Sequence, residues 1–125
     1  MAELAAASGS QLFTVIATAS SIARGLRVTL DSSSTVSASA ISVRGDYVVA
    51  GAIAASGTGA AYDINNSGII PCVASEAIAV GDLCYSAASG KVSKTSGGGA
   101  VIMGKANTAA SGDGVLFELI TQIAA

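Results

Sequence analysis

Glycine recurs at short intervals along most of this 125-residue chain, which limits the length of any regular element. Short apolar runs rich in β-branched residues lie between the glycines: RVTL (27–30), YVVA (47–50), IIPCVA (69–74), VIMG (101–104) and VLFELI (115–120). Short strands separated by frequent turn signals are typical of β-sandwiches and barrels. The single proline, Pro71, suits an edge strand or a bend. The sequence therefore predicts an all-β fold, a compact β-sandwich or small barrel.

Two glycine-bearing segments occur twice, in the same order. AASGTGAAYDI (54–64) matches AASGDGVLFEL (109–119) at an offset of 55 residues (109 minus 54), and AISVRGDYVV (40–49) matches AIAVGDLCY (77–85). Ordered repetition of this kind indicates repeated structural units. We therefore expect two related halves, about 36–70 and 73–120, within a single β domain of residues 27–125.

The repeated glycines and aspartates are predicted to form turns rather than ligand sites. Glycine adopts positive φ at no steric cost, and an aspartate side chain can bond the backbone that follows it. The predicted turn residues are Gly45, Asp46, Gly57, Gly59, Gly81, Asp82, Gly112, Asp113 and Gly114. After the last of these turns, strand alternation places Val115, Phe117 and Leu119 on one face.

The residues that catalysis and metal binding require are missing or scattered. The chain has no histidine, which excludes histidine-based triads and general bases. Cys72 and Cys84 are too few for a zinc site, and we expect buried apolar residues rather than a disulfide. The carboxylates are spread one per turn or strand, so no paired-acid site is predicted. No catalytic residue, metal ligand or cofactor is therefore predicted.

Charge is sparse: 11% of the residues are charged, and the net charge is −2. The six basic residues form no cluster, which argues against nucleic-acid binding. The longest uncharged run, 4–23, contains glycine, glutamine, serine and threonine, so no membrane-spanning segment is predicted. A surface rich in Ser, Thr, Gly and Ala suits close contact with other protein at little desolvation cost.

Residues 1–26 differ from the rest and are predicted to form an extended N-terminal arm or a first strand. Their apolar residues are concentrated in the segment LFTVI (12–16).

The segment 77–119 carries a series of turn and strand motifs in order: A-h-x-x-G-D-x-h-Y, G-K-V, h-h-G-x-A and a G-D-x-x-h-x-h finish, where h is hydrophobic. These positions are Ala77, Gly81, Asp82, Tyr85, Gly90, Lys91, Val92, Gly104, Ala106, Gly112 and Asp113. Together with the earlier Gly-Asp, Ser-Gly-x-Gly and SGIIP segments, they resemble the capsid decoration (cement) proteins of tailed phages over about residues 36–120.

The resemblance implies a non-enzymatic virion protein, made in the host cytoplasm and bound to the outer surface of an assembled head. Its implied partner is the major capsid protein, and the implied state is a homo-oligomer, a trimer in preference to a dimer. We expect Leu12, Phe13, Val15 and Ile16 to make capsid or inter-subunit contacts, the alternative being ordinary core. The alternative function is another virion or adhesion module, such as a tail or fibre component.

Overall fold

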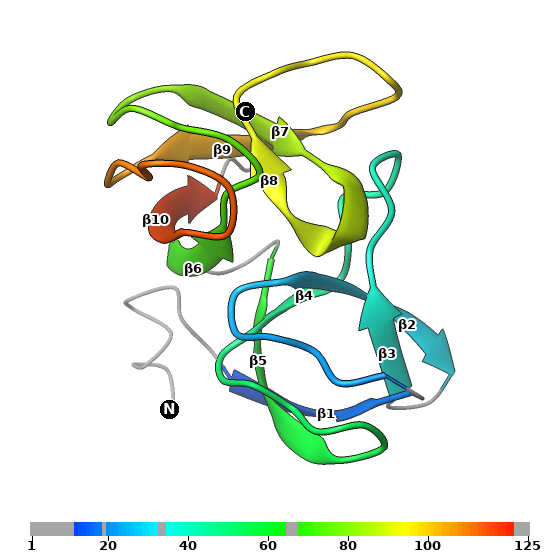
Figure 1. The fold of residues 1–125 in the computed structure, drawn as a ribbon. Coiled ribbons are helices and arrows are strands. Elements are labelled where there is room, and N and C mark those ends of the chain that lie inside the picture. Colours follow the sequence, from blue (N-terminus) through cyan, green and yellow to red (C-terminus); the bar gives the residue numbers. More distant parts are fainter. Residues whose placement is uncertain (1–11, 19, 33–34, 65–67, 122–125) are drawn as a thin grey trace.

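The computed structural model of the protein describes residues 12–18, 20–32, 35–64 and 68–121. They form two lobes of β-strands, the first (blue to green) below the second (green to red) in Figure 1. The prediction of an all-β fold is confirmed.

The first lobe is a closed barrel of five strands. They are β1 (Leu12–Ala17), β2 (Arg27–Ser32), β3 (Thr35–Ala38), β4 (Tyr47–Val49) and β5 (Thr58–Asp63). The strand order is β1-β3-β2-β4-β5, and an antiparallel pairing of β1 with β5 closes the barrel. Residues 12–17 are thus a barrel strand, and residues 1–11 lie outside the described residues.

The second lobe is a five-stranded sheet with the order β6-β10-β9-β7-β8. Its elements are β6 (Ile69–Val73), β7 (Leu83–Ser86), the 3₁₀ turn η1 (Ala88–Gly90), β8 (Val92–Ser93), β9 (Ile102–Ala106) and β10 (Leu116–Thr121). Pro71 lies in β6, at an edge of this sheet, as its missing N–H requires.

The two lobes repeat one topology. Read in the opposite direction, the second sheet runs β8-β7-β9-β10-β6, which matches β3-β2-β4-β5-β1 strand for strand. The parallel pair Ala17–Val36 of the barrel has its counterpart in the parallel bridge Ala74–Val92. Likewise, the antiparallel bridge Ile22–Ile53 corresponds to Ile78–Ala110.

The structure corrects the limits and the register of the expected halves. The repeating units are 12–64 and 69–121 rather than 36–70 and 73–120. Gly81 corresponds to Gly25, because each follows a bridge residue by three positions and has nearly the same φ, 87° and 86°. Gly45 is therefore not its counterpart. Strand pairing defines which positions of the two units are equivalent. Glycine-aspartate turns do not define it, because they can occur at any chain reversal.

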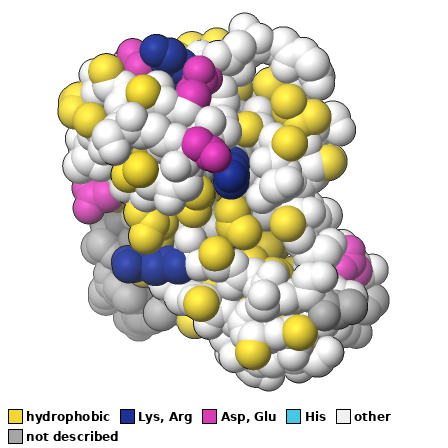
Figure 2. Space-filling view, viewed as in Figure 1, with side chains coloured by type: hydrophobic (Ala, Val, Ile, Leu, Met, Phe, Trp, Pro, Cys, Tyr) yellow, Lys and Arg dark blue, Asp and Glu magenta, His cyan; other side chains and the backbone are white. Residues whose placement is uncertain are grey.

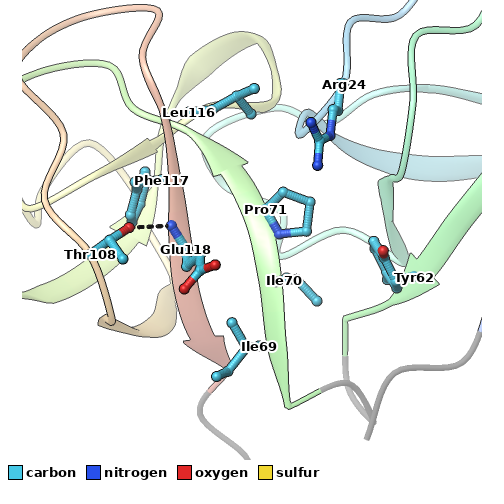
Figure 3. A pocket seen from close by; sticks show the side chains of 9 residues that line it. All are labelled: Arg24, Tyr62, Ile69, Ile70, Pro71, Thr108, Leu116, Phe117 and Glu118. Atoms are coloured by element: carbon cyan, nitrogen blue, oxygen red, sulfur yellow. Dashed lines mark hydrogen bonds between the residues drawn. The ribbon is translucent and has the colours of Figure 1, made fainter. Parts of the chain in front are cut away.

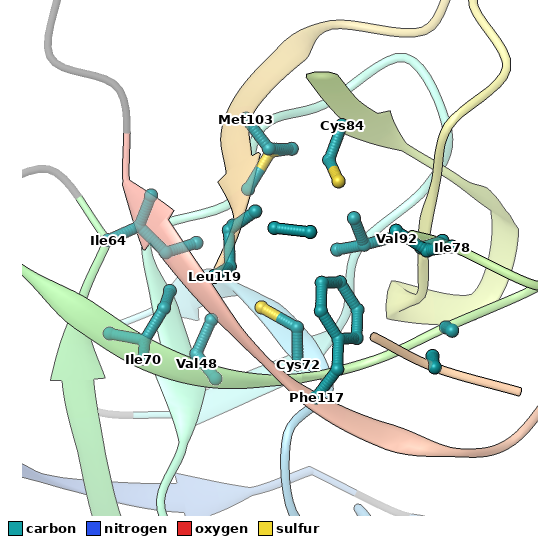
Figure 4. Packing of buried hydrophobic residues seen from close by; sticks show 13 residues of the cluster. Val48, Ile64, Ile70, Cys72, Ile78, Cys84, Val92, Met103, Phe117 and Leu119 are labelled. Carbon is teal, nitrogen blue, oxygen red and sulfur yellow. The ribbon is translucent and has the colours of Figure 1, made fainter. Parts of the chain in front are cut away.

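Two clusters of buried side chains fill the lobes. The barrel encloses residues such as Val15, Val28 and Val36. The second cluster lies against the inner face of the five-stranded sheet of the second lobe. Val48 and Ile64 of the first lobe also belong to it (Figure 4). The outside of the barrel thus completes the core of the second lobe, and the two lobes cannot separate without exposing apolar surface.

Cys72 and Cys84 are both buried in the second cluster and form no disulfide, as expected. Burial raises the pKa of both thiols, that of Cys84 to about 11. Unfolded thiols titrate near 8.5, so between about pH 8.5 and 11 the folded state holds more protons. The stability that these thiols contribute is complete below that window and is lost as the pH rises through it.

We predict that neither thiol reacts with a disulfide reagent in the folded protein, because the thiolate is the reactive species and both sulfurs are buried. Both should react at the rate of a free thiol in guanidinium chloride. Rapid labelling of either cysteine under native conditions would contradict the packing described.

We also predict that Gly25→Ala destabilises the protein more than Gly81→Ala. Both positions impose the same φ strain, about 1–2 kcal/mol for a non-glycine residue. A Cβ at Gly25 would lie 2.6 Å from Leu116 Cδ2 and 3.1 Å from Val73 Cγ2 in the second lobe, whereas at Gly81 nothing lies within 4 Å. Chemical denaturation should resolve the difference, and equal losses would mean that the lobes do not meet closely at Gly25.

Candidate functional site

The described residues contain no group of three or more His, Cys, Asp or Glu that is able to hold a metal ion. Within the same residues, no helix has the length and apolar character needed to cross a membrane. The features described below are the junction between the lobes and the surface beside it.

Arg27, at the start of β2, is the polar centre of the junction between the lobes. Its side chain is completely buried, although arginine is rarely buried without partners. Residues 27 and 48 face each other across β2 and β4, and Val48 is likewise completely buried. Arg27 and Val48 thus form an outward-facing row of the barrel, and the second lobe covers this row.

All five N–H groups of the Arg27 guanidinium donate to backbone carbonyls. Nε donates to the Lys91 oxygen at 3.0 Å, and one Nη2 bond goes to Ala87, so two bonds reach the second lobe. The other three go to the loop between β3 and β4, at Ala40, Val43 and Arg44. The guanidinium thus ties that loop to the segment around η1.

Burial lowers the pKa of Arg27 to about 10, because the protein interior disfavours the charged form. The side chain remains a cation at neutral pH. Carbonyl dipoles supply its stabilisation, and no described carboxylate bonds it.

Further hydrogen bonds stabilise the junction between the two lobes. Ser86, which is buried in β7, donates to the carbonyl of Ile41 and accepts from the Val101 N–H at 2.8 Å. Arg44 Nη1 donates to the Ile102 carbonyl at 2.6 Å. Gly90 has φ 77°, and a Cβ there would lie 2.7 Å from the Arg27 carbonyl oxygen. Only glycine allows the backbone of η1 to approach Arg27 this closely.

A shallow pocket of about 360 Å³ opens beside the junction (Figure 3). Arg24 and Tyr62 line it from the first lobe, and Ile69, Leu116 and Glu118 are among its lining residues from the second. Hydrophobic side chains also gather along the boundary between the lobes in Figure 2.

The large apolar side chains exposed to solvent are concentrated on the second lobe. Six of the eight belong to it, namely Ile69, Val80, Leu83, Ile102, Leu116 and Ile120, whereas the first lobe has Leu30 and Val43. The described surface is therefore asymmetric, and the second lobe is the one more suited to bind protein through apolar contacts.

The four residues expected to contact capsid or a second subunit all lie in β1. Leu12 pairs with Tyr62 through the backbone, and the Phe13 ring lies 5.4 Å from that of Tyr47. Phe13 and Ile16 are half-buried. Val15 is only 2% exposed and belongs to the barrel core, which corrects the expectation of a contact at this residue.

The predicted turn residues lie at or beside chain reversals. Gly45, Gly81 and Gly114 have positive φ, and the Gly112 carbonyl accepts from Val115. Gly57 donates to the Ala54 carbonyl. Gly59 is the second residue of β5, and a Cβ there would lie 2.5 Å from Ile53 Cγ1.

The sequence predicted that the aspartates of these turns would bond the backbone that follows them, but in the structure they have other partners. Asp46 accepts from the N–H of Leu30 in β2, and Asp82 from that of Ala79 before it, at 2.8 and 2.9 Å. Asp113 forms an exposed ion pair with Lys91. Asp46 therefore holds a loop to a neighbouring strand.

Sequence reasoning missed Arg27, whose side chain makes five hydrogen bonds, more than any other side chain of the described residues. Within the segment GLRVTL a single arginine normally indicates a solvent-facing position in a strand. Its acceptors are backbone carbonyls 13 to 64 residues away, and these leave no pattern in the side chains.

The comparisons with known proteins decide the family. The phage cement protein family matches residues 6–121, nearly the whole chain. The chain belongs to the phage cement protein family. A search of curated proteins finds no match to this cement protein.

A solved structure similar to this cement protein is that of the N base of the head fibre protein gp8.5 of bacteriophage phi29. The two are 19% identical, with a TM-score of 0.72, and the match covers 90% of this chain and 94% of the other. At this identity the likeness shows the fold, including both lobes. Family membership makes the chain a structural component of a phage virion.

We predict that Arg27→Met destabilises the cement protein by roughly 3 kcal/mol or more, because the five hydrogen bonds of a completely buried guanidinium to backbone carbonyls are lost. Arg44→Met, which also removes a guanidinium that bonds the second lobe, should cost below about 1 kcal/mol, since Arg44 is only half-buried. Urea denaturation compares the two. Equal effects would contradict the role assigned to Arg27.

Proposed function

We propose that this cement protein binds the outer surface of an assembled phage head, with the major capsid protein as its partner, and reinforces the capsid lattice. The observation that carries the proposal is the family match over residues 6–121. The similarity to the base of a phi29 head fibre protein supports a position on the head rather than on the tail.

The physical properties of the chain suit this role. A rigid body with few charges can lie against a shell at little desolvation cost. Many copies that each bridge neighbouring shell subunits add modest binding energies into a large effect on the whole particle. We further propose that the protein acts as a homo-oligomer and that β1, through Leu12, Phe13 and Ile16, contributes to contacts with the capsid or a second subunit.

The test uses heads that lack the protein. Purified protein added to such heads should co-sediment with them, saturate at a fixed number of copies per shell subunit, and raise the temperature at which the shells rupture. Association with isolated tails or fibres in place of heads would overturn the proposal and favour the alternative virion module.

A variant tests the role of β1. Ile16→Gln should weaken head binding about tenfold, because it removes apolar surface from the contact. Leu30→Gln is the matched control, since Leu30 is a partly exposed apolar residue of the same barrel. Normal binding by a folded Ile16→Gln variant would remove β1 from the contact without affecting the head-binding proposal.

A further inference from the structure

The pocket between the lobes carries a cation that no described residue neutralises. Arg24 lines this pocket and is exposed, and the described residues offer its guanidinium no hydrogen bond or ion pair. The other two arginines are both bonded, Arg27 to five carbonyls and Arg44 to the Ile102 carbonyl. A guanidinium without an internal partner is able to pair with a carboxylate of another molecule, in a bidentate geometry.

The turn that carries Arg24 does not need an arginine. Gly81 of the second lobe corresponds to Gly25, so the residue before it, Val80, corresponds to Arg24. Because the two glycines have nearly the same φ, the same turn forms with valine in place of arginine. Neither an internal bond nor the turn conformation accounts for the guanidinium, which is therefore available to a partner.

Close packing fixes the backbone of the pocket beside Arg24. Gly25 is buried, and a Cβ there would lie 2.6 Å from Leu116 Cδ2 and 3.1 Å from Val73 Cγ2. Leu116 also lines the pocket and is 43% exposed, and Ile69, which lines it too, is 46% exposed. The cation thus lies beside apolar surface on a backbone that is already ordered, so a ligand would lose little affinity to ordering of the site.

One wall of the pocket is an open sheet edge. Within the described residues, β6 is the end strand of its sheet and forms its ladder with β10. Glu118, opposite Pro71, directs its N–H and C=O to the segment 107–108 instead of β6. By the alternation of an antiparallel ladder, the carbonyls of Ile69 and Pro71 therefore face away from β10. Such carbonyls accept from the N–H groups of an extended chain, whereas Pro71 has no N–H to donate.

The acid of the pocket restricts where a ligand's charge is favourable. Glu118 is the acidic residue of the lining, and Pro71 lies between it and Arg24 in Figure 3. Asn107 Nδ2 donates to Glu118 Oε1 at 2.9 Å, and the carboxylate remains an anion that repels other acids. An acidic side chain is therefore favoured at Arg24 and disfavoured across β6, which gives the pocket a direction.

We propose that this pocket holds an extended segment of the major capsid protein, with an acidic side chain on Arg24 and a neighbouring apolar side chain against Ile69 and Leu116. The proposal rests on the proposed function, to which it adds a surface and the chemistry of the contact. β1, which is also proposed to contribute to contacts, begins at the same place, because Leu12 pairs with Tyr62 and Tyr62 lines the pocket. The volume of about 360 Å³ lies within the range of ligand pockets.

Removal of the charge tests the contact. Arg24→Met keeps the length of the side chain and should weaken binding to heads about tenfold in a co-sedimentation titration. Lys105→Met is the matched control and should bind as the wild type does, since Lys105 is an exposed cation of β9 outside the pocket. If the wild type binds heads, wild-type binding by Arg24→Met, or equal losses in both variants, overturns the pocket proposal and leaves head binding standing. A wild type that does not bind heads overturns both.

A photo-crosslinking amino acid tests the same pocket with Arg24 intact. p-Benzoylphenylalanine in place of Ile69 should crosslink to the major capsid protein on heads, and mass spectrometry should find an acidic residue beside an apolar one in the crosslinked peptide. The same amino acid in place of Leu83, which is 38% exposed in β7 and outside the pocket, is the control. Crosslinks from position 83 but not from position 69, or to a peptide without an acidic residue, overturn the proposal.

Discussion

A guanidinium removed from water is tolerated only when each of its N–H groups finds an acceptor, and Arg27 satisfies this condition with carbonyls from both lobes. The condition fixes geometry, because the carbonyls of Ala87 and Lys91 accept together only in one placement of the lobes. Gly90 lets the backbone approach, and Val48 beside Arg27 fills the second core. The lobes therefore share polar and apolar contacts and pack together as one unit.

The repeat explains why one topology serves two purposes. In the barrel, the outward row that contains Arg27 and Val48 has become an internal contact. In the second lobe the corresponding positions are Leu83 and Lys105, which remain at the surface. The two five-stranded units thus differ on the same face: in the first this face joins the lobes, and in the second it faces outward. In the proposed role on a phage head, such division separates internal stability from external binding.

Local structure was largely predictable from the sequence, because short-range chemistry controls it. The β-branched runs between glycines located β2, β4, β6, β9 and β10. Alternation in VLFEL placed Phe117 and Leu119 in the core, and Pro71 indicated an edge. The resemblance to phage cement proteins, drawn from turn motifs, was confirmed by the family match.

What escaped prediction depends on contacts between distant residues. The repeat register was misplaced since Ala, Ser, Gly and Asp recur at every turn, whereas the equivalence of Gly25 with Gly81 appears only through strand pairing. The site was missed for the same reason: Arg27 bonds backbone atoms, which carry no sequence signature. Val15 illustrates the limit further, because an apolar residue in a first strand fits a core and a contact surface equally well.

The most direct measurement is electron cryomicroscopy of heads to which the purified protein has been added. The account predicts density for the protein at fixed positions on the outer surface of the shell, with both lobes visible in the relative orientation that Arg27 imposes. Heads without added density, or density that fits only one lobe while the other is free to move, would contradict it.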